Sequence, residues 1–232
     1  MEPPVVVPST TVEEAMRDTC STVSVKGLSI QLIDQINCIE PNVMKSFAGA
    51  PGLQYSDYVF PFMQTAAADT LVSLLEAGGT LTLTSALRTL PQQYLLYRWY
   101  QRGACNANLA AAPGRSNHNG GLAIDIADSS TWRARLRAAE FIDNVSGEPW
   151  HFEYTGTGTR DIRSLSVRAF QQLWNRNHPN DPIDEDGIYG PQTEGALQNS
   201  PADGFAIGPG CPTSNPYSIP ADTGAEPEPI RE

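Results

Sequence analysis

Long hydrophobic runs are missing from this chain of 232 residues. No apolar stretch approaches the roughly 20 residues that a membrane-spanning helix needs, so we expect no membrane span. The first residues, Met-Glu-Pro-Pro, also lack the basic and apolar regions of a signal peptide. Either export is signalled in another way or the sequence starts after its targeting segment.

Positive charge is also scarce. The chain has 15 Lys and Arg residues against 26 Asp and Glu residues, and its net charge is −11. Nucleic-acid phosphates attract basic surfaces, so this balance argues against a nucleic-acid partner. It also gives little long-range attraction to an anionic wall polymer. The hydrophobic share of 40% is adequate for a packed core, and the length allows one domain, or a domain with a small module. We expect a monomer.

Cysteine occurs only four times, at Cys20, Cys38, Cys105 and Cys211. None of these has the Cys-x-x-Cys spacing of a metal site or a redox centre. Four well-separated cysteines fit two disulfides in an oxidising, extracytoplasmic compartment, that is, the periplasm, the cell surface or the medium, although three pairings are possible. We expect Cys20–Cys38 and Cys105–Cys211, and free buried thiols are the alternative.

Histidine is rarer still, with three residues, and two of them lie in the most informative segments of the chain. These segments are residues 116–125 (SNHNGGLAID) and residues 148–151 (EPWH). Imidazole and carboxylate groups are ordinary Zn²⁺ ligands, and a catalytic zinc keeps three protein ligands and one open position. We therefore predict that His118, Asp125 and His151 bind one Zn²⁺ per chain.

A carboxylate that lies close to a metal without binding it can carry a proton. Zinc lowers the pKa of a water ligand to roughly 7, and Glu148 is the predicted base that takes its proton and later gives it to a leaving amine. Each residue also has a simpler interpretation: His118 as an ordinary hydrogen-bonding histidine, Asp125 as a turn cap, Glu148 as loop charge. Only the combination of these groups indicates a site. The third histidine, His178, lies in a polar turn and is interpreted as structural.

The two segments resemble a known family of enzymes. The pattern Ser-x-His, six residues, Asp, followed by Glu-x-x-His, is similar to that of the zinc D-alanyl-D-alanine carboxypeptidase/dipeptidase family of peptidoglycan peptidases. A third segment, residues 85–93 (SALRTLPQQ), resembles the family's Ser-x-x-Arg-Ser/Thr sequence with a following glutamine. The usual glycine-aromatic pair before the arginine is Ala86-Leu87 here. The resemblance covers residues 60–155.

This resemblance implies a function and roles for individual residues. It implies a secreted zinc metallopeptidase that hydrolyses peptidoglycan stem peptides, with cleavage of D-alanyl-D-alanine as the default reaction. Arg88 would meet the scissile carbonyl oxygen or the substrate carboxylate, since a guanidinium suits both, and it could instead form a structural ion pair. Further substrate contacts are expected from Ser85, Gln93, Ser116 and Trp150.

Three other functions use the same residues. A peptidoglycan endopeptidase, which cuts inside the stem peptide or a cross-link, has the same chemistry in a cleft of another shape. A non-catalytic cell-wall-binding protein would keep the fold and bind metal without hydrolysing peptides. A metal-dependent amidase or signalling domain is the third alternative.

Periodicity along the chain predicts an α+β fold, with a small antiparallel sheet and flanking helices that carry the zinc site, plus a small helical C-terminal module. Alternation predicts strands at residues 80–85 and 121–126 and an extended segment at 150–154; helical spacing predicts helices at 12–17, 29–37, 64–77, 91–101, 132–141 and 165–175. The expected units are an N-terminal extension packed on the catalytic domain (1–57), a zinc peptidase domain (58–158), a helical module (162–210) and a disordered tail (211–232).

The expected C-terminal module has its own motif. Residues 186–197 (DGIYGPQTEGAL) follow a helix that contains residues 167–173, and together they resemble the small helical peptidoglycan-binding module. Two features depart from that pattern: the loop at 175–185 is long and polar, and Pro201 cuts short the last helix. The resemblance implies wall binding, or a packing role alone.

Overall fold

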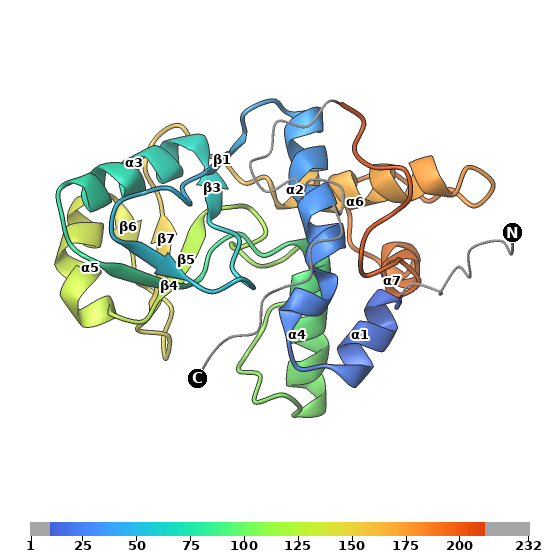
Figure 1. Cartoon of the computed structure of the whole chain (residues 1–232), viewed down its shortest axis with the longest axis horizontal. Helices are drawn as coiled ribbons and strands as arrows, with labels where there is room; N and C mark the ends of the chain where they lie inside the picture. The colour runs from blue at the N-terminus through green and yellow to red at the C-terminus, as the bar shows by residue number, and fades with distance from the viewer. Residues whose placement is uncertain (1–9, 212–232) are drawn as a thin grey trace, which may run out of the picture.

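The computed structural model describes residues 10–211 and confirms the α+β fold (Figure 1). Its helices are α1 (Val12–Asp18), the 3-10 helix η1 (Thr22–Val25), α2 (Lys26–Ile39), α3 (Thr65–Glu76), α4 (Leu90–Arg102), α5 (Ser129–Ala138), α6 (Arg163–Asn177) and α7 (Pro191–Gln198). Its strands are β1 (Met44–Ser46), β2 (Leu53–Tyr55), β3 (Phe62–Gln64), β4 (Leu81–Ser85), β5 (Ala123–Ile126), β6 (Phe141–Ile142) and β7 (His151–Tyr154). Within this range, no helix has the length and apolar character that crossing a membrane requires.

The central element is a five-stranded sheet with the order β2-β4-β5-β7-β6. All its pairs are antiparallel except β2–β4, which is parallel, and β1 and β3 form a separate antiparallel pair. Helices α3 and α5 cover one face of the large sheet and share a buried apolar cluster with it. Because side chains alternate along a strand, the polar residues of β5 and β7 fall on the opposite face.

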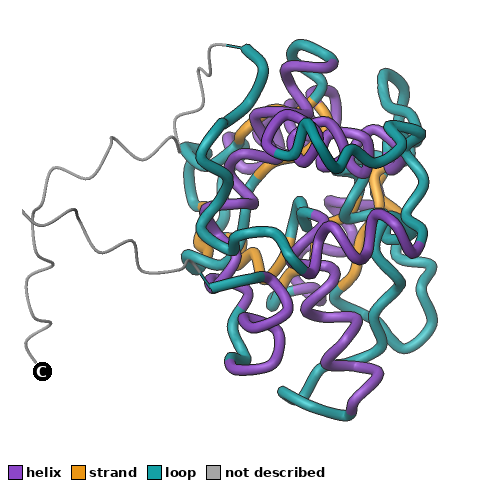
Figure 2. The backbone as a smooth tube through the Cα atoms, turned by 90° about the vertical axis from the view of Figure 1, so that its right-hand side faces the viewer, coloured by secondary structure: helices purple, strands orange, loops and turns teal. Residues whose placement is uncertain are grey.

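The other half of the molecule is helical. Helices α1, α2, α4, α6 and α7 share a second buried cluster. Residues from the chain before the large sheet and residues from the chain after it both contribute to this cluster. Helices α2 and α6 cross each other (Figure 1), and Figure 2 views the molecule from this side. The segment before the sheet and the segment after it therefore pack together on α4.

The disulfide pairing that we expected from the sequence is wrong. The structure joins Cys20 to Cys105 and Cys38 to Cys211. Helix α1 packs on α4, so the residue after α1 meets the residue after α4. The C-terminal segment lies along α2, where Gln35 accepts a hydrogen bond from the Gly210 amide at 3.0 Å, and this brings Cys211 to the last turn of the helix.

Two local features also differ from the sequence predictions. The region after residue 41 contains β1 and β2, for which the sequence analysis predicted no strands. The helix expected at 132–141 begins earlier, at Ser129, and ends at Ala138. It ends there because Glu140 has a left-handed φ of 65°, which a helix does not accommodate, and Phe141 then enters β6. Most of the expected tail, residues 212–232, lies outside the described residues, as do residues 1–9.

Candidate metal centre

Strand pairing places two of the predicted ligands side by side. In the antiparallel pair β5–β7, Asp125 lies directly opposite His151, and opposed residues have Cβ atoms about 5 Å apart. Their neighbours Ile124 and Phe152 point to the other face and are fully buried in the apolar cluster. The apolar neighbours therefore fix which face of the sheet carries the two ligands.

His118 reaches the same place from a turn. Its Nδ1 lies 2.8 Å from the Ala86 carbonyl oxygen, and a carbonyl can only accept, so Nδ1 carries the proton. The lone pair of Nε2 then points into the cluster, where it is buried, has no hydrogen-bond partner and lies 3.3 Å from Asp125 Oδ2. The buried lone pair of Nε2 therefore faces another acceptor and is left unsatisfied unless a cation binds it. Burial lowers the pKa of His118, which favours the neutral form that ligates metals.

The three ligand groups fit a divalent metal ion. One ligand atom each from His118, Asp125 and His151 can be chosen so that all three lie within 4.8 Å of one another, and all three residues are buried. Two imidazoles and one carboxylate are a donor set that suits Zn²⁺. The orphaned Nε2 of His118 and this convergence together indicate a metal centre.

His151 is oriented by an acidic residue that the sequence analysis missed. Its Nδ1 lies 2.9 Å from Asp125 Oδ1, and its Nε2 lies 3.0 Å from Glu153 Oε1. Burial lowers the pKa of His151, but the hydrogen bonds with Asp125 and Glu153 outweigh it and raise the pKa to about 9. The i, i+2 spacing along β7, which puts Glu153 on the same face as His151, was the signal in the sequence.

Arg88 lies beside the ligands. Its Nη2 donates to Asp125 Oδ2 at 2.5 Å, and its Nε donates to Ser85 Oγ at 2.8 Å. Burial raises the pKa of Asp125, but the charges and hydrogen bonds of His118, His151 and Arg88 hold it well below its usual range. Asp125 is therefore a carboxylate, the form that binds a metal.

Glu148 is close to the cluster without joining it. Its Oε2 lies 4.0 Å from His151 Nδ1, and its side chain is 27% exposed. A short turn positions it, in which the His151 amide donates to the Glu148 carbonyl at 3.1 Å. The carboxylate can thus meet both solvent and a ligand bound at the metal centre.

The remaining predicted residues lie in different surroundings. Ser116 is mostly buried, and its Oγ accepts a hydrogen bond from the His118 amide at 3.3 Å. Gln93 is fully buried, and its Nε2 donates to the Ala111 carbonyl at 2.7 Å. Trp150 is exposed at the surface of the cleft described below. Substrate contacts by these three residues, and by Ser85, stay predictions.

The turn that carries His118 depends on a glycine. Gly121 has a φ of +63°, and a Cβ there would lie 2.7 Å from the Met44 side chain. The backbone next to it is held on both sides, since the Gln64 amide donates to the Gly121 carbonyl at 2.9 Å and the Arg88 amide to the His118 carbonyl at 3.2 Å. The turn is therefore fixed in the position that aims the imidazole at β5.

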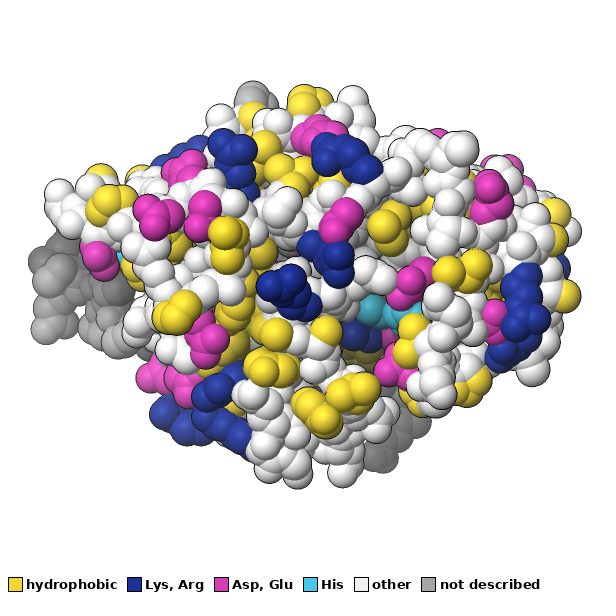
Figure 3. Space-filling view, turned by 180° about the vertical axis from the view of Figure 1, so that it is seen from behind, with side chains coloured by type: hydrophobic (Ala, Val, Ile, Leu, Met, Phe, Trp, Pro, Cys, Tyr) yellow, Lys and Arg dark blue, Asp and Glu magenta, His cyan; other side chains and the backbone are white. Residues whose placement is uncertain are grey.

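The metal centre opens into a cleft of about 440 Å³, whose lining includes Arg88, Asp125, Glu148 and Trp150. In Figure 3 histidine side chains are visible in a hollow, with acidic and basic side chains beside them. The ligands are buried, yet the space beside them is open to an incoming chain.

A buried His-Asp-His cluster at an open cleft, with a free carboxylate and a guanidinium beside it, defines a candidate metallohydrolase. Residues 61–144 match the family model VanY, D-alanyl-D-alanine carboxypeptidase. The match includes Arg88, His118 and Asp125. His151 in β7 and Glu148 in the turn before β7 follow the match in the sequence and lie at the same site. No curated protein matches the chain.

Proposed function

We propose that this protein is an extracytoplasmic zinc metallopeptidase that hydrolyses peptidoglycan stem peptides, with D-alanyl-D-alanine carboxypeptidase activity as its main reaction. The observation that carries the proposal is the convergence of His118, Asp125 and His151 beside Arg88 and Glu148, at an open cleft. The family match supports a carboxypeptidase of peptidoglycan. Two disulfides support an oxidising compartment.

Zinc bound by these three residues would supply Lewis acidity, both to a water molecule and to the scissile carbonyl. The protein's own contribution is to hold the donors in place: Ala86 fixes the tautomer of His118, and Glu153 orients the ring of His151. Such outer partners set the affinity of a metal site as well as its geometry.

Glu148 is the proposed general base. Its carboxylate takes a proton from the attacking water and returns it to the amine that leaves when the peptide bond breaks. Its distance of 4.0 Å from His151 Nδ1 supports a position within reach of the reacting atoms. Arg88, held by Ser85 and Asp125, would stabilise the negative charge that develops on the carbonyl oxygen.

Wall binding by residues 162–210 remains part of the proposal. Residues 178–190 join α6 to α7 and include a turn at Gly187, whose amide donates to the buried Gln171 side chain at 2.8 Å. This supports the helix-turn-helix pattern of the module. Binding of sacculi by a catalytically inactive variant would test the affinity directly.

The activity is tested with two substrates, a defined stem pentapeptide and cross-linked sacculi, followed by mass analysis of the products. We expect the loss of one terminal alanine from the pentapeptide, and products cut inside the stem or the cross-link would indicate an endopeptidase instead. In Glu148→Ala, kcat should fall by about 10²–10⁴-fold, with the bound zinc unchanged. Normal turnover by this variant would contradict the role given to Glu148.

A further inference from the structure

The cleft is longer than the metal centre requires. It begins at Arg88, just before α4, and its lining continues through Leu96 and Trp99 to Cys105, just after that helix. Helix α4 has 13 residues, which corresponds to about 20 Å at 1.5 Å per residue. An extended peptide advances about 3.3–3.6 Å per residue, so a peptide that ran the whole length of α4 would have five or six residues, far more than a dipeptide.

The far end of this cleft combines residues inside the family match with residues that precede it. We define the distal wall as Cys20, Ser21, Thr22, Tyr58 and residues 105–110, all of which line the cavity. Residues 20–22 and Tyr58 come before residue 61, where the match begins. The distal wall is therefore formed where the segment before the matched region meets residues 105–110 within it.

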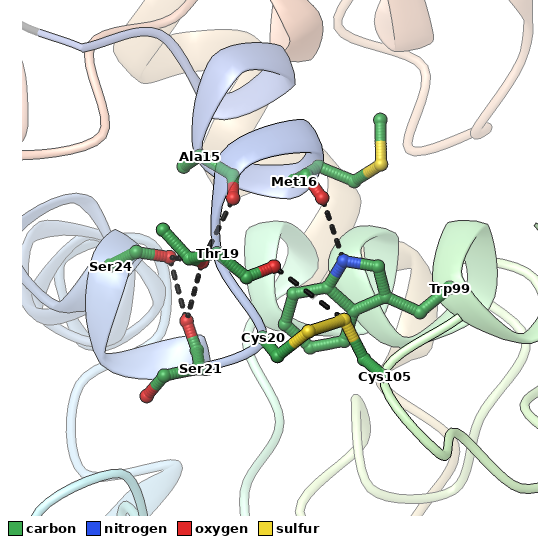
Figure 4. The surroundings of a disulfide bond; sticks show 8 residues. All are labelled: Ala15, Met16, Thr19, Cys20, Ser21, Ser24, Trp99 and Cys105. Carbon is green, nitrogen blue, oxygen red and sulfur yellow. Dashed lines mark hydrogen bonds between the residues drawn. A yellow bond between two sulfur atoms is a disulfide. The ribbon is translucent and has the colours of Figure 1, made fainter.

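Covalent and hydrogen bonds hold the distal wall in place. The Cys20–Cys105 disulfide joins its two main parts, and the Trp99 indole beside it donates to the Met16 carbonyl at 2.7 Å (Figure 4). On the other side, Gln92 Nε2 donates to the Tyr58 carbonyl at 2.9 Å. A wall fixed in this way can bind a ligand without losing much conformational entropy.

Its surface is uncharged and partly apolar. Among the residues that line the cavity, only Arg88, Asp125 and Glu148 carry charge, and all three belong to the metal centre. Within residues 10–211, seven large hydrophobic side chains are exposed, and three of them, Tyr58, Leu109 and Trp150, line this one cavity. Exposed apolar side chains gathered in a cleft mark a binding surface.

We propose that the distal wall is a specificity subsite for the stem peptide on the amino side of the scissile bond. The inference rests on the proposed function: the substrate of a carboxypeptidase has one residue on the carboxyl side of the bond, so the rest of the peptide must extend along the cleft. The subsite makes the enzyme select peptides of about five residues over free D-alanyl-D-alanine, through apolar contacts and hydrogen bonds to uncharged groups.

The test compares kcat/KM for the dipeptide D-alanyl-D-alanine and the stem pentapeptide. We expect the wild type to prefer the pentapeptide, and the double variant Tyr58→Ala/Leu109→Ser to reduce that preference about tenfold, because the two apolar contacts together are worth on the order of a tenfold change in affinity. For the pentapeptide, the double variant should raise KM and leave kcat unchanged, because the removed interaction is equally strong in the ground state and the transition state. Both side chains are exposed, so the fold is preserved.

Matched controls separate this role from general effects. Ile188→Ser removes an equally exposed aliphatic side chain away from the cleft and should leave the preference as it is. The pair Cys20→Ser/Cys105→Ser should lower the preference, whereas Cys38→Ser/Cys211→Ser, which removes a disulfide that does not line this cavity, should not. Circular dichroism checks that each variant is folded.

The outcomes distinguish the inference from the proposed function. Equal kcat/KM for dipeptide and pentapeptide, or a Tyr58→Ala/Leu109→Ser variant that matches the wild type, would overturn the inference and leave the peptidase intact. Absence of hydrolysis of either peptide would overturn the proposed function. In that case, calorimetry measures the affinity of the wild type and of the double variant for the pentapeptide. A weaker affinity in the double variant supports the subsite, and an equal affinity, or no binding by the wild type, refutes it.

Discussion

Among single residues, His118 shows how the backbone decides the chemistry of a side chain. The Ala86 carbonyl keeps the proton on Nδ1, and the buried Nε2 is left with a lone pair facing an oxygen of Asp125. A cation bound there removes the conflict between the two acceptors. This arrangement accounts for a buried polar atom that would otherwise cost free energy.

Glu153 provides a test of the outer partners of the site. Glu153→Gln weakens the group that accepts from His151 Nε2, so we expect zinc affinity to fall about 10–100-fold. Equilibrium competition with a chelating dye measures it. Glu76→Gln, at an exposed position of α3, is the control and should bind zinc as the wild type does. An unchanged affinity in Glu153→Gln would show that this residue does not orient the ligand.

Gly121 tests the turn that carries His118. Gly121→Ala forces a side chain into a left-handed conformation and against Met44, and we expect the free energy of unfolding to fall by about 2 kcal/mol or more. Urea denaturation gives the value. Gly195→Ala in α7, where a Cβ meets nothing within 4 Å, should instead be neutral or stabilising. Similar effects of the two changes would contradict the account of the turn.

Among the elements, the pair β5–β7 decides the site. Alternation in the sequence predicted both strands, since Ile124, Ile126 and Phe152 are apolar and Asp125 and His151 are not. It could not predict that Asp125 pairs with His151, because register depends on how strands meet in three dimensions. The motif spacing and the family resemblance identified the ligands before the pairing was known.

The disulfides show the opposite case. Positions in the sequence carry no information on which cysteines meet, and the expected pairing of Cys20 with its nearest cysteine was wrong. The packing of α1 on α4 and the path of the C-terminal segment along α2 determine the actual pairs. Glu153 and the distal wall escaped the sequence analysis for a similar reason, because each acts through neighbours that are distant in the chain.

In the whole molecule, the helical half behaves as one packing unit. Helix α6 contributes Val167, Phe170, Leu173 and Trp174 to the same buried cluster as α1, α2 and α4. The sequence predicted these helices by their periodicity, but periodicity does not reveal which apolar faces meet. We propose that residues 162–210 fold together with the N-terminal extension rather than as a separate module.

A truncation tests this proposal. A chain that ends at residue 158 leaves the apolar faces of α1, α2 and α4 without their partners, and each large side chain that loses its cover costs about 1.5–3 kcal/mol. We expect it to lose cooperative thermal unfolding, as measured by near-ultraviolet circular dichroism. A chain that ends at residue 211 keeps every described contact and should melt as the full chain does. If the shorter chain melted cooperatively at the melting temperature of the full chain, the two parts would instead be independent domains.

The most direct test of the central claim is the metal content of the purified protein. After removal of metal with a chelator and titration with Zn²⁺, elemental analysis should find about one zinc per chain, and almost none in His118→Ala. Circular dichroism should show that the variant is folded. A folded wild-type protein that takes up no zinc, or a His118→Ala variant that binds as much as the wild type, would contradict the account.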